Sequence, residues 1–116
     1  MNGTRSMGQL AVALLTFAAT SSPALATVDA AAAKEGSSLY ENYCATCHGE
    51  QLHNTSGGVT FDLRRLRPDE HERFVHSVLN GKNQMPPWRG VIDDNKIDDI
   101  WAYIRASVDG PSQQSK

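Results

Sequence analysis

Two cysteines and a histidine form the stretch Cys44-Ala-Thr-Cys47-His48, and the 116-residue chain has no other cysteine. The two thiols are three residues apart, and an imidazole follows the second one directly. Three kinds of site use such a spacing: a redox-active dithiol, half of a zinc site, and a covalently attached haem. The rest of the sequence has to distinguish between them.

A zinc site would need two more fixed ligands, for which His71 and His76 are the candidates. The spacing from Cys47 to His71 is about twice that of a zinc finger. A thioredoxin-type dithiol begins a helix within a βαβ unit, but the sequence has no alternating apolar pattern typical of strands. Both alternatives remain open, and both are less favoured than the haem.

In a haem site, Cys44 and Cys47 would add to the two vinyl groups, and His48 would bind the iron from one side. An iron that only carries electrons also needs a second protein ligand. Met85 is the best candidate, because Pro86 and Pro87 stiffen its loop and methionine with histidine is a known pair of haem ligands. The competing interpretation of Met85 is a gap-filling core residue. Rival ligands are His53, His71 and His76.

The first 26 residues have the pattern of a secretory signal peptide. A positive Arg5 is followed by an apolar segment from Leu10 to Ala19 and by the small residues Ala24-Leu25-Ala26. The apolar segment is shorter than the about 20 residues that a membrane span needs. We therefore expect cleavage after Ala26, export to the periplasm or an equivalent space, and no membrane-spanning segment in the mature protein.

Composition points to one small domain that carries a cofactor. The formal net charge of −2 indicates no basic face and hence no nucleic-acid partner. Chains of this size often rely on a metal, a covalent cross-link or a cofactor to complete their core. Only 7% of the residues are aromatic, so something else is expected to fill the centre.

Apolar periodicity predicts an all-α domain over residues 34–107, with loops between three main helices. The first helix is expected to start at the capping-box pattern Ser38-Leu-Tyr-Glu41 and to reach Cys44. Residues 27–33 are expected to form a flexible leader, and residues 108–116 a frayed tail. The three helices are predicted near residues 38–44, 68–80 and 94–107.

This pattern resembles the class I cytochromes c, small electron carriers with one haem, over nearly all of residues 34–107. The likeness is carried by Cys44-Ala-Thr-Cys47-His48 and Met85, by Gly36 with Tyr40, and by Ile100 with Tyr103. It implies a cytochrome c-like fold, one covalent haem c, and electron transfer rather than enzymatic catalysis. It also implies that Gly36, Tyr40, Ile100 and Tyr103 form a helix crossing, and that Trp88 and Tyr103 pack near the haem.

One feature departs from the family. Its members usually have a proline shortly after the haem-binding histidine, and the carbonyl of that proline accepts the second imidazole N–H. No proline lies between His48 and Pro68. Because a metal-bound histidine nearly always has such a partner, we expect a carbonyl within residues 58–63 to supply it.

A narrower resemblance concerns the redox partners. Residues 58–64 and 85–88 are similar to cytochromes that accept electrons from PQQ-dependent alcohol dehydrogenases. The resemblance implies a monomer with such a dehydrogenase as donor and a terminal oxidase as acceptor. Residues 64–67, Lys82 and Arg89 would gather positive charge near the Met85 loop, where Arg64, Arg65 or Arg89 would meet the haem propionates. The alternative function is a small haem enzyme or gas-binding protein with an open distal site.

Overall fold

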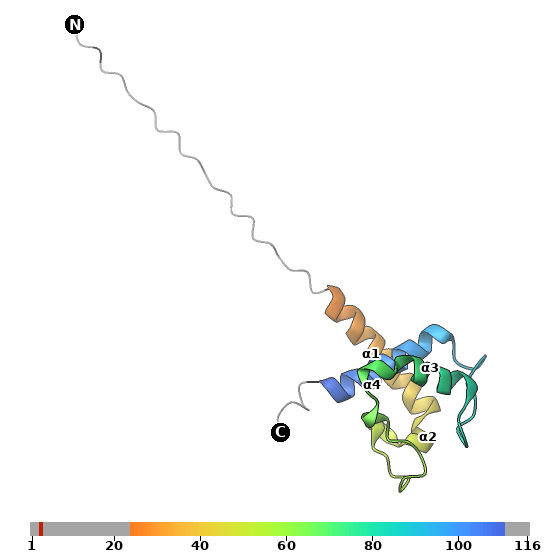
Figure 1. The fold of residues 1–116 in the computed structure, drawn as a ribbon. Coiled ribbons are helices and arrows are strands. Elements are labelled where there is room, and N and C mark those ends of the chain that lie inside the picture. The colour runs from red at the N-terminus through yellow and green to blue at the C-terminus, as the bar shows by residue number, and fades with distance from the viewer. Residues whose placement is uncertain (1–2, 4–23, 111–116) are drawn as a thin grey trace.

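The computed structural model describes residue 3 and residues 24–110. Within this part of the chain the structure is all-α, as predicted, with two isolated bridges and no strand (Figure 1). The elements are α1 (Ala24–Tyr43), α2 (Ala45–His48), η1 (Glu50–Leu52), η2 (Leu63–Arg65), η3 (Pro68–Glu70), α3 (His71–Asn80) and α4 (Asp94–Asp109). The three η elements are short 3-10 helices.

Most of the predicted signal peptide and the last six residues lie outside the described residues. The cleavage after Ala26 therefore stays a prediction. In the part of the chain that the structure describes, no helix is both long enough and apolar enough to cross a membrane.

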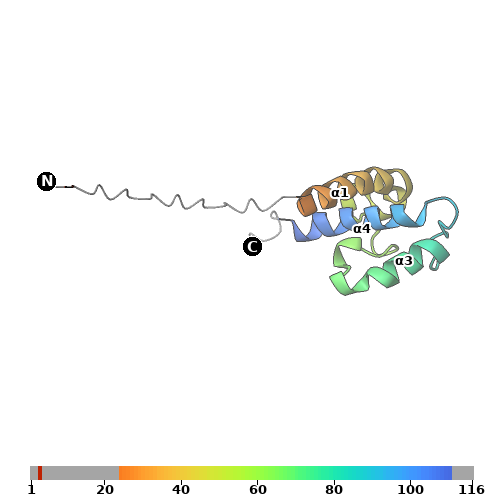
Figure 2. The same cartoon turned by 90° about the horizontal axis from the view of Figure 1, so that it is seen from above.

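Helices α1 and α4 cross in close contact, and α4 lies between α1 and α3 (Figure 2). At the crossing, a Cβ atom added to Gly36 would lie 1.8 Å from the carbonyl oxygen of Asp99 and 2.8 Å from the nitrogen of Ile100. Tyr40 is fully buried, and its ring centroid lies 5.4 Å from that of Tyr103. The predicted crossing of Gly36, Tyr40, Ile100 and Tyr103 is confirmed.

The core is built from apolar side chains that recur at helical spacing. Helix α4 buries Ile97, Ile100 and Ile104 on one face, and α3 buries Phe74 and Val78. The complete set of buried hydrophobic residues is Tyr40, Ala45, Leu52, Leu66, Phe74, Val78, Ile92, Ile97, Ile100 and Ile104.

The predicted start of the first helix was wrong. Helix α1 begins at Ala24, so residues 27–33, expected as a flexible leader, are helical. The run of alanines at residues 30–33 explains this, because alanine has the highest helix propensity. Ser38 does not cap a helix. It lies in the helix interior, where its hydroxyl donates to the carbonyl of Lys34 four residues earlier, at 3.5 Å.

The other two helices agree with the prediction apart from their ends. Residues 68–80 form η3 followed directly by α3, and the chain leaves α3 at Gly81, whose φ is 75°. Glu70 completes the start of this segment by accepting a hydrogen bond from the N–H of Arg67 at 2.8 Å. Helix α4 continues two residues beyond the predicted Ser107, and an ion pair between Arg105 and Asp109 closes its last turn.

Candidate cofactor-binding site

The two cysteines and His48 share one turn at the junction of α1 and α2. The N–H of Cys44 donates to Tyr40 at 2.8 Å and so continues the hydrogen bonding of α1. The N–H groups of Cys47 and His48 both donate to the carbonyl of Cys44, at 3.2 and 2.9 Å. Cys44 is partly buried and Cys47 is exposed. The structure therefore places the three residues together, as their spacing predicts.

The environment of Cys44 bears on the competing chemistries. Burial, with smaller contributions from Cys47 and Glu41, raises the pKa of the Cys44 thiol to about 12. Redox dithiols rely on a lowered thiol pKa, and the surroundings of Cys44 shift its pKa in the opposite direction. The environment of Cys44 therefore does not favour a redox dithiol.

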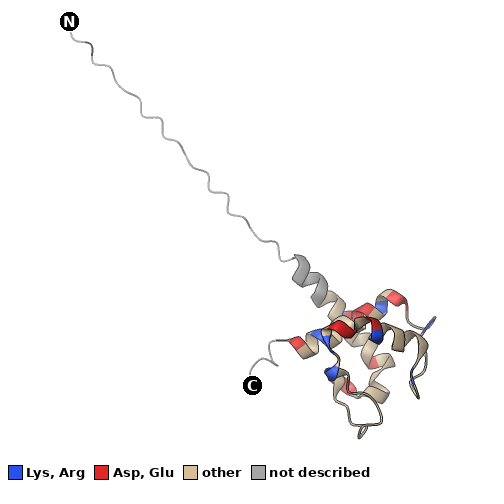
Figure 3. Cartoon of the chain, in the orientation of Figure 1, with Lys and Arg blue, Asp and Glu red and all other residues tan. Residues whose placement is uncertain are grey.

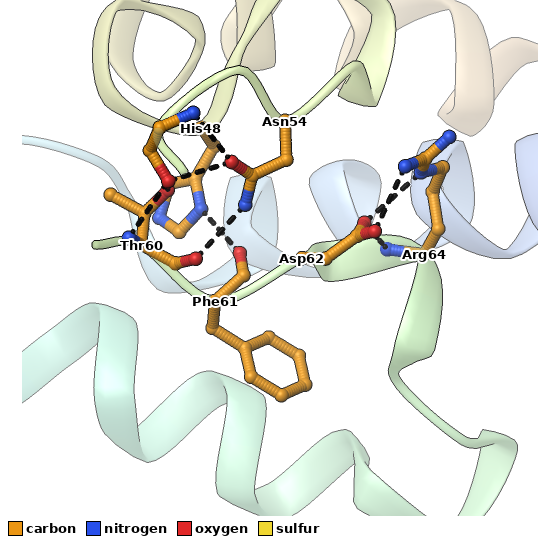
Figure 4. Close-up of polar contacts among 7 residues, drawn as sticks. His48, Asn54, Thr60, Phe61, Asp62 and Arg64 are labelled. Carbon is orange, nitrogen blue, oxygen red and sulfur yellow. Dashed lines mark hydrogen bonds and ion pairs between the residues drawn. The ribbon is translucent and has the colours of Figure 1, made fainter. Parts of the chain in front are cut away.

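His48 is oriented by a backbone carbonyl from a distant loop. Its Nδ1 lies 3.1 Å from the carbonyl oxygen of Phe61 (Figure 4). Because a carbonyl can only accept, Nδ1 carries the proton and Nε2 is left as the free lone pair. A metal-binding histidine needs this tautomer. The prediction that a carbonyl within residues 58–63 faces His48 is confirmed, and the residue is Phe61.

Helix α1 holds the chain immediately after His48. The hydroxyl of Tyr40 donates to the carbonyl of Gly49 at 2.7 Å, and a carboxylate oxygen of Glu41 accepts from the N–H of Gln51 at 2.9 Å. Gly49 has a φ of 89°, and a Cβ atom there would lie 1.8 Å from the carbonyl oxygen of His53. The chain can turn back at this point only without a side chain. Sequence reasoning assigned Tyr40 to packing alone and missed its hydrogen bond.

A second set of polar contacts was also missed. Asn54, Ser56 and Thr60 are hydrogen-bonded to one another in the loop before Phe61. Figure 4 shows the bond from the side-chain amide of Asn54 to the carbonyl of Thr60. The available signal was the Asn-x-Ser pattern directly before Gly57 and Gly58, because asparagine and serine in turns often bond to nearby backbone.

Met85 lies in a tight turn after α3. The N–H of Lys82 donates to the carbonyl of Met85 at 3.1 Å, and the N–H of Met85 donates back to Lys82 at 3.0 Å. Gly81 opens this turn, and a Cβ atom there would lie 2.7 Å from the carbonyl oxygen of Met85. The side chain of Met85 is partly buried and packs against the core. The turn is therefore held by backbone contacts as well as by the prolines.

Trp88 brings the Met85 turn to the cysteine-containing turn. Its N–H donates to the carbonyl of Val78 on α3 at 2.8 Å. Its ring meets that of Tyr43 edge-on, with centroids 5.5 Å apart. Because Tyr43 directly precedes Cys44, this contact places the segment three residues after Met85 against the start of the Cys44–His48 turn.

The rival histidines have other partners or are exposed. Nε2 of His71 lies 2.8 Å from a carboxylate oxygen of Asp98, and its ring packs edge-on against Trp101, so His71 joins α3 to α4. His53 and His76 are exposed. Among the described residues, no three His, Cys, Asp or Glu side chains are arranged to hold a metal ion together. The zinc alternative, which needs His71 and His76 beside the cysteines, has no support.

Several arginines that were considered for the propionates have carboxylate or amide partners. The guanidinium of Arg64 donates to both carboxylate oxygens of Asp62, and these hydrogen bonds lower the pKa of Asp62. Arg89 donates to the side chain of Asn80. Arg67, which is not one of these candidates, pairs with Asp69. Acidic and basic residues are accordingly interspersed over the domain (Figure 3). A role of these arginines toward propionates stays a prediction.

Comparison with known proteins gives consistent results. A protein family described as cytochrome C oxidase, cbb3-type, subunit III matches residues 31–104. The chain is 34% identical over 103 residues to cytochrome c6 of Nostoc sp., a match that covers 86% of this chain and 88% of that protein. It is 32% identical over 108 residues to cytochrome c-555 of Methylococcus capsulatus, covering 86% and 82%.

A third similarity is to part of a larger enzyme. The chain is 37% identical over 84 residues to the quinohemoprotein alcohol dehydrogenase ADH-IIG of Pseudomonas putida. This match covers 71% of the chain but only 11% of the dehydrogenase. No solved structure matches the chain.

Proposed function

The chain belongs to the c-type cytochromes, and we propose that it is an electron carrier in which His48 and Met85 are the axial ligands of a single haem c. Covalently bound haem c is the cofactor of this family, and it supplies one-electron chemistry between ferrous and ferric iron. Cys44 and Cys47 are the residues that would hold it through thioether bonds.

The observation that carries the proposal is the orientation of His48. Its Nδ1–H is bonded to the carbonyl of Phe61, so Nε2 is the only ring nitrogen left for iron. The imidazole is attached to the same turn as both thiols, which fixes its position relative to the two attachment points. Hydrogen bonding at Nδ1 also makes Nε2 a stronger donor.

Met85 is proposed as the second ligand because its turn is closed by two backbone hydrogen bonds and lies beside the cysteine-containing turn through the Tyr43–Trp88 contact. A thioether donates weakly and favours the ferrous state. With His48 and Met85 both holding the iron, no position would be left for a substrate, which is why we propose a carrier and not an enzyme.

The ligand assignment can be tested with the ferric absorption spectrum of the holoprotein. We expect Met85→Ala to abolish the near-infrared band that arises from sulfur bound to ferric iron, while His76→Ala, an exposed control, retains it. Persistence of the band in Met85→Ala would remove Met85 as the ligand. Ready binding of carbon monoxide by the unmodified ferrous protein would instead favour a gas-binding protein or haem enzyme with an open distal site.

We further place the carrier in the periplasm, with a quinoprotein alcohol dehydrogenase as donor and a terminal oxidase as acceptor. The signal-peptide pattern of residues 1–26 supports export. The similarity to ADH-IIG supports the donor class, and the family description supports an oxidase. The test is stopped-flow reduction by a PQQ-dependent alcohol dehydrogenase and its substrate. No reduction of the ferric protein on mixing would exclude this donor class.

A further inference from the structure

The carbonyl that orients His48 belongs to a loosely packed segment, in which the ring of Phe61 contacts the guanidinium of Arg73 at 5.4 Å. Phe61 lies thirteen residues after His48 in the sequence, and its side chain is 44% exposed. Val59, two residues earlier, is 75% exposed. Gly57 and Gly58 add backbone freedom, and the proline usual in related proteins is absent. Something other than burial has to keep this carbonyl facing the imidazole.

Thr60, the residue before Phe61, forms hydrogen bonds through its N–H, its carbonyl and its hydroxyl. Its N–H donates to the hydroxyl oxygen of Ser56 at 3.0 Å, and its carbonyl accepts from the side-chain amide of Asn54 at 2.9 Å. Its hydroxyl donates to the carbonyl of Cys47 at 3.1 Å. Thr60 therefore ties the loop directly to the turn that carries both thiols and His48.

The carbonyl of Cys47 can accept this hydrogen bond because α2 ends at His48 and the N–H of Gln51 bonds to Glu41 on α1. In a continuous helix the N–H of Gln51 would donate to Cys47, four residues back. Here α2 ends at His48, and the N–H of Gln51 donates to Glu41 instead. The carbonyl of Cys47 instead accepts a hydrogen bond from the hydroxyl of Thr60. Without this bond the carbonyl would be left unpaired at the helix end.

Asn54 keeps the loop closed behind Thr60. Its side-chain oxygen accepts from both the N–H and the hydroxyl of Ser56, at 2.9 and 2.7 Å. Its side-chain nitrogen donates to Thr60. Since a backbone N–H can only donate and a carbonyl can only accept, the two ends of the amide cannot be exchanged. The chain beyond Phe61 is held as well, because the carboxylate of Asp62 accepts from the N–H of Arg64 at 3.1 Å.

We propose that Thr60, held by Asn54 and Ser56, is a positioning residue that keeps the Phe61 carbonyl on Nδ1 of His48 and so sets the electron-donating strength of this ligand. The proposal rests on the function proposed above. A strong hydrogen bond at Nδ1 raises the basicity of the ligand and thereby stabilises the ferric form. Loosening the loop weakens that bond and shifts the equilibrium toward the ferrous form.

Four variants of the full-length holoprotein test this. Thr60→Val keeps the shape and loses the hydroxyl, whereas Thr60→Ser retains the hydroxyl. Thr55→Val removes an exposed hydroxyl of the same loop and is the matched control. Asn54→Asp can still accept hydrogen bonds from Ser56 but can no longer donate one to the carbonyl of Thr60. It therefore tests whether the bond from Asn54 is needed to hold Thr60.

Two measurements are made on each variant: the ferrous-to-ferric ratio at one fixed ambient potential, and the hydrogen-exchange rate of His48 Nδ1–H in the ferrous state by NMR. For Thr60→Val we expect a two- to tenfold higher ratio, about the effect of one net hydrogen bond, together with faster exchange. Thr60→Ser and Thr55→Val should match the wild type. Asn54→Asp should show faster exchange, as Thr60→Val does. If Thr60→Val does not retain haem, the exchange rate of Asn54→Asp decides the question, because the added negative charge stabilises the ferric form by itself.

Wild-type values for both measurements in Thr60→Val, or a wild-type exchange rate in Asn54→Asp where that variant decides, would overturn the positioning role. An equal change in Thr55→Val would do the same, because it would show a general effect of the loop. Failure of the proposed function is seen separately and earlier, since the wild-type protein would then lack the mass of the bound haem or the spectrum of histidine ligation.

Discussion

Replacing Gly36 by alanine tests the close approach of α1 and α4. The new Cβ atom would lie 1.8 Å from the carbonyl oxygen of Asp99, 1.6 Å short of the 3.4 Å at which ordinary contact begins. The opposing atoms are backbone, so no side-chain rotation can relieve the overlap, and α4 itself has to move. Overpacking of this kind costs about 3 kcal/mol, the upper end of its usual range.

Alanine also favours the helix by about 1 kcal/mol relative to glycine, so the net destabilisation of Gly36→Ala should be about 2 kcal/mol. For a domain of this size that lowers the melting temperature by about 8–16 °C. Thermal unfolding followed by far-ultraviolet circular dichroism measures the change. The control is Ser38→Ala in the same helix, which should be neutral or slightly stabilising because Ser38 is an interior residue and not a cap.

A melting temperature of Gly36→Ala equal to or above that of the wild type would refute the crossing geometry. A loss of about 1 kcal/mol in Ser38→Ala would instead show that Ser38 caps the helix after all. The two results are independent, because one reports the contact with α4 and the other the start of α1.

Two further predictions concern contacts near the cofactor site. Tyr40→Phe removes the buried hydroxyl that donates to the carbonyl of Gly49. We therefore expect the free energy of unfolding, measured by denaturant titration, to fall by about 1–2 kcal/mol. An unchanged denaturation midpoint would contradict the hydrogen bond. Asp62→Asn tests the pH dependence of stability. Arg64 lowers the pKa of Asp62 in the folded state, so the carboxylate stabilises the fold at pH values above its unfolded-state pKa. This stabilisation is lost as the pH falls through the folded-state pKa. Wild type should therefore be more stable than Asp62→Asn at pH 7 but not near pH 2, and a constant difference across that range would count against the assignment.

Local sequence was sufficient wherever the determining contacts are local. Two thiols and an imidazole at Cys44, Cys47 and His48 fall on one turn because helical hydrogen bonds span only three or four residues. Pro68 and Gly81 bracket a helix because their own backbone preferences start and stop it. The local failure among the helices was the start of α1, where a capping-box pattern at Ser38 competed with a run of alanines, and the higher propensity of the alanines prevailed.

Sequence alone identified the chemistry of the site but not the groups that orient it. A covalent attachment motif and a methionine followed by two prolines are readable because the residue types themselves define what they can bind. The Phe61 carbonyl, the bond from Thr60 to Cys47 and the Tyr43–Trp88 contact depend on where loops return in space. Backbone carbonyls carry no sequence signature, since every residue has one. Only the tertiary structure could decide which of them reaches His48.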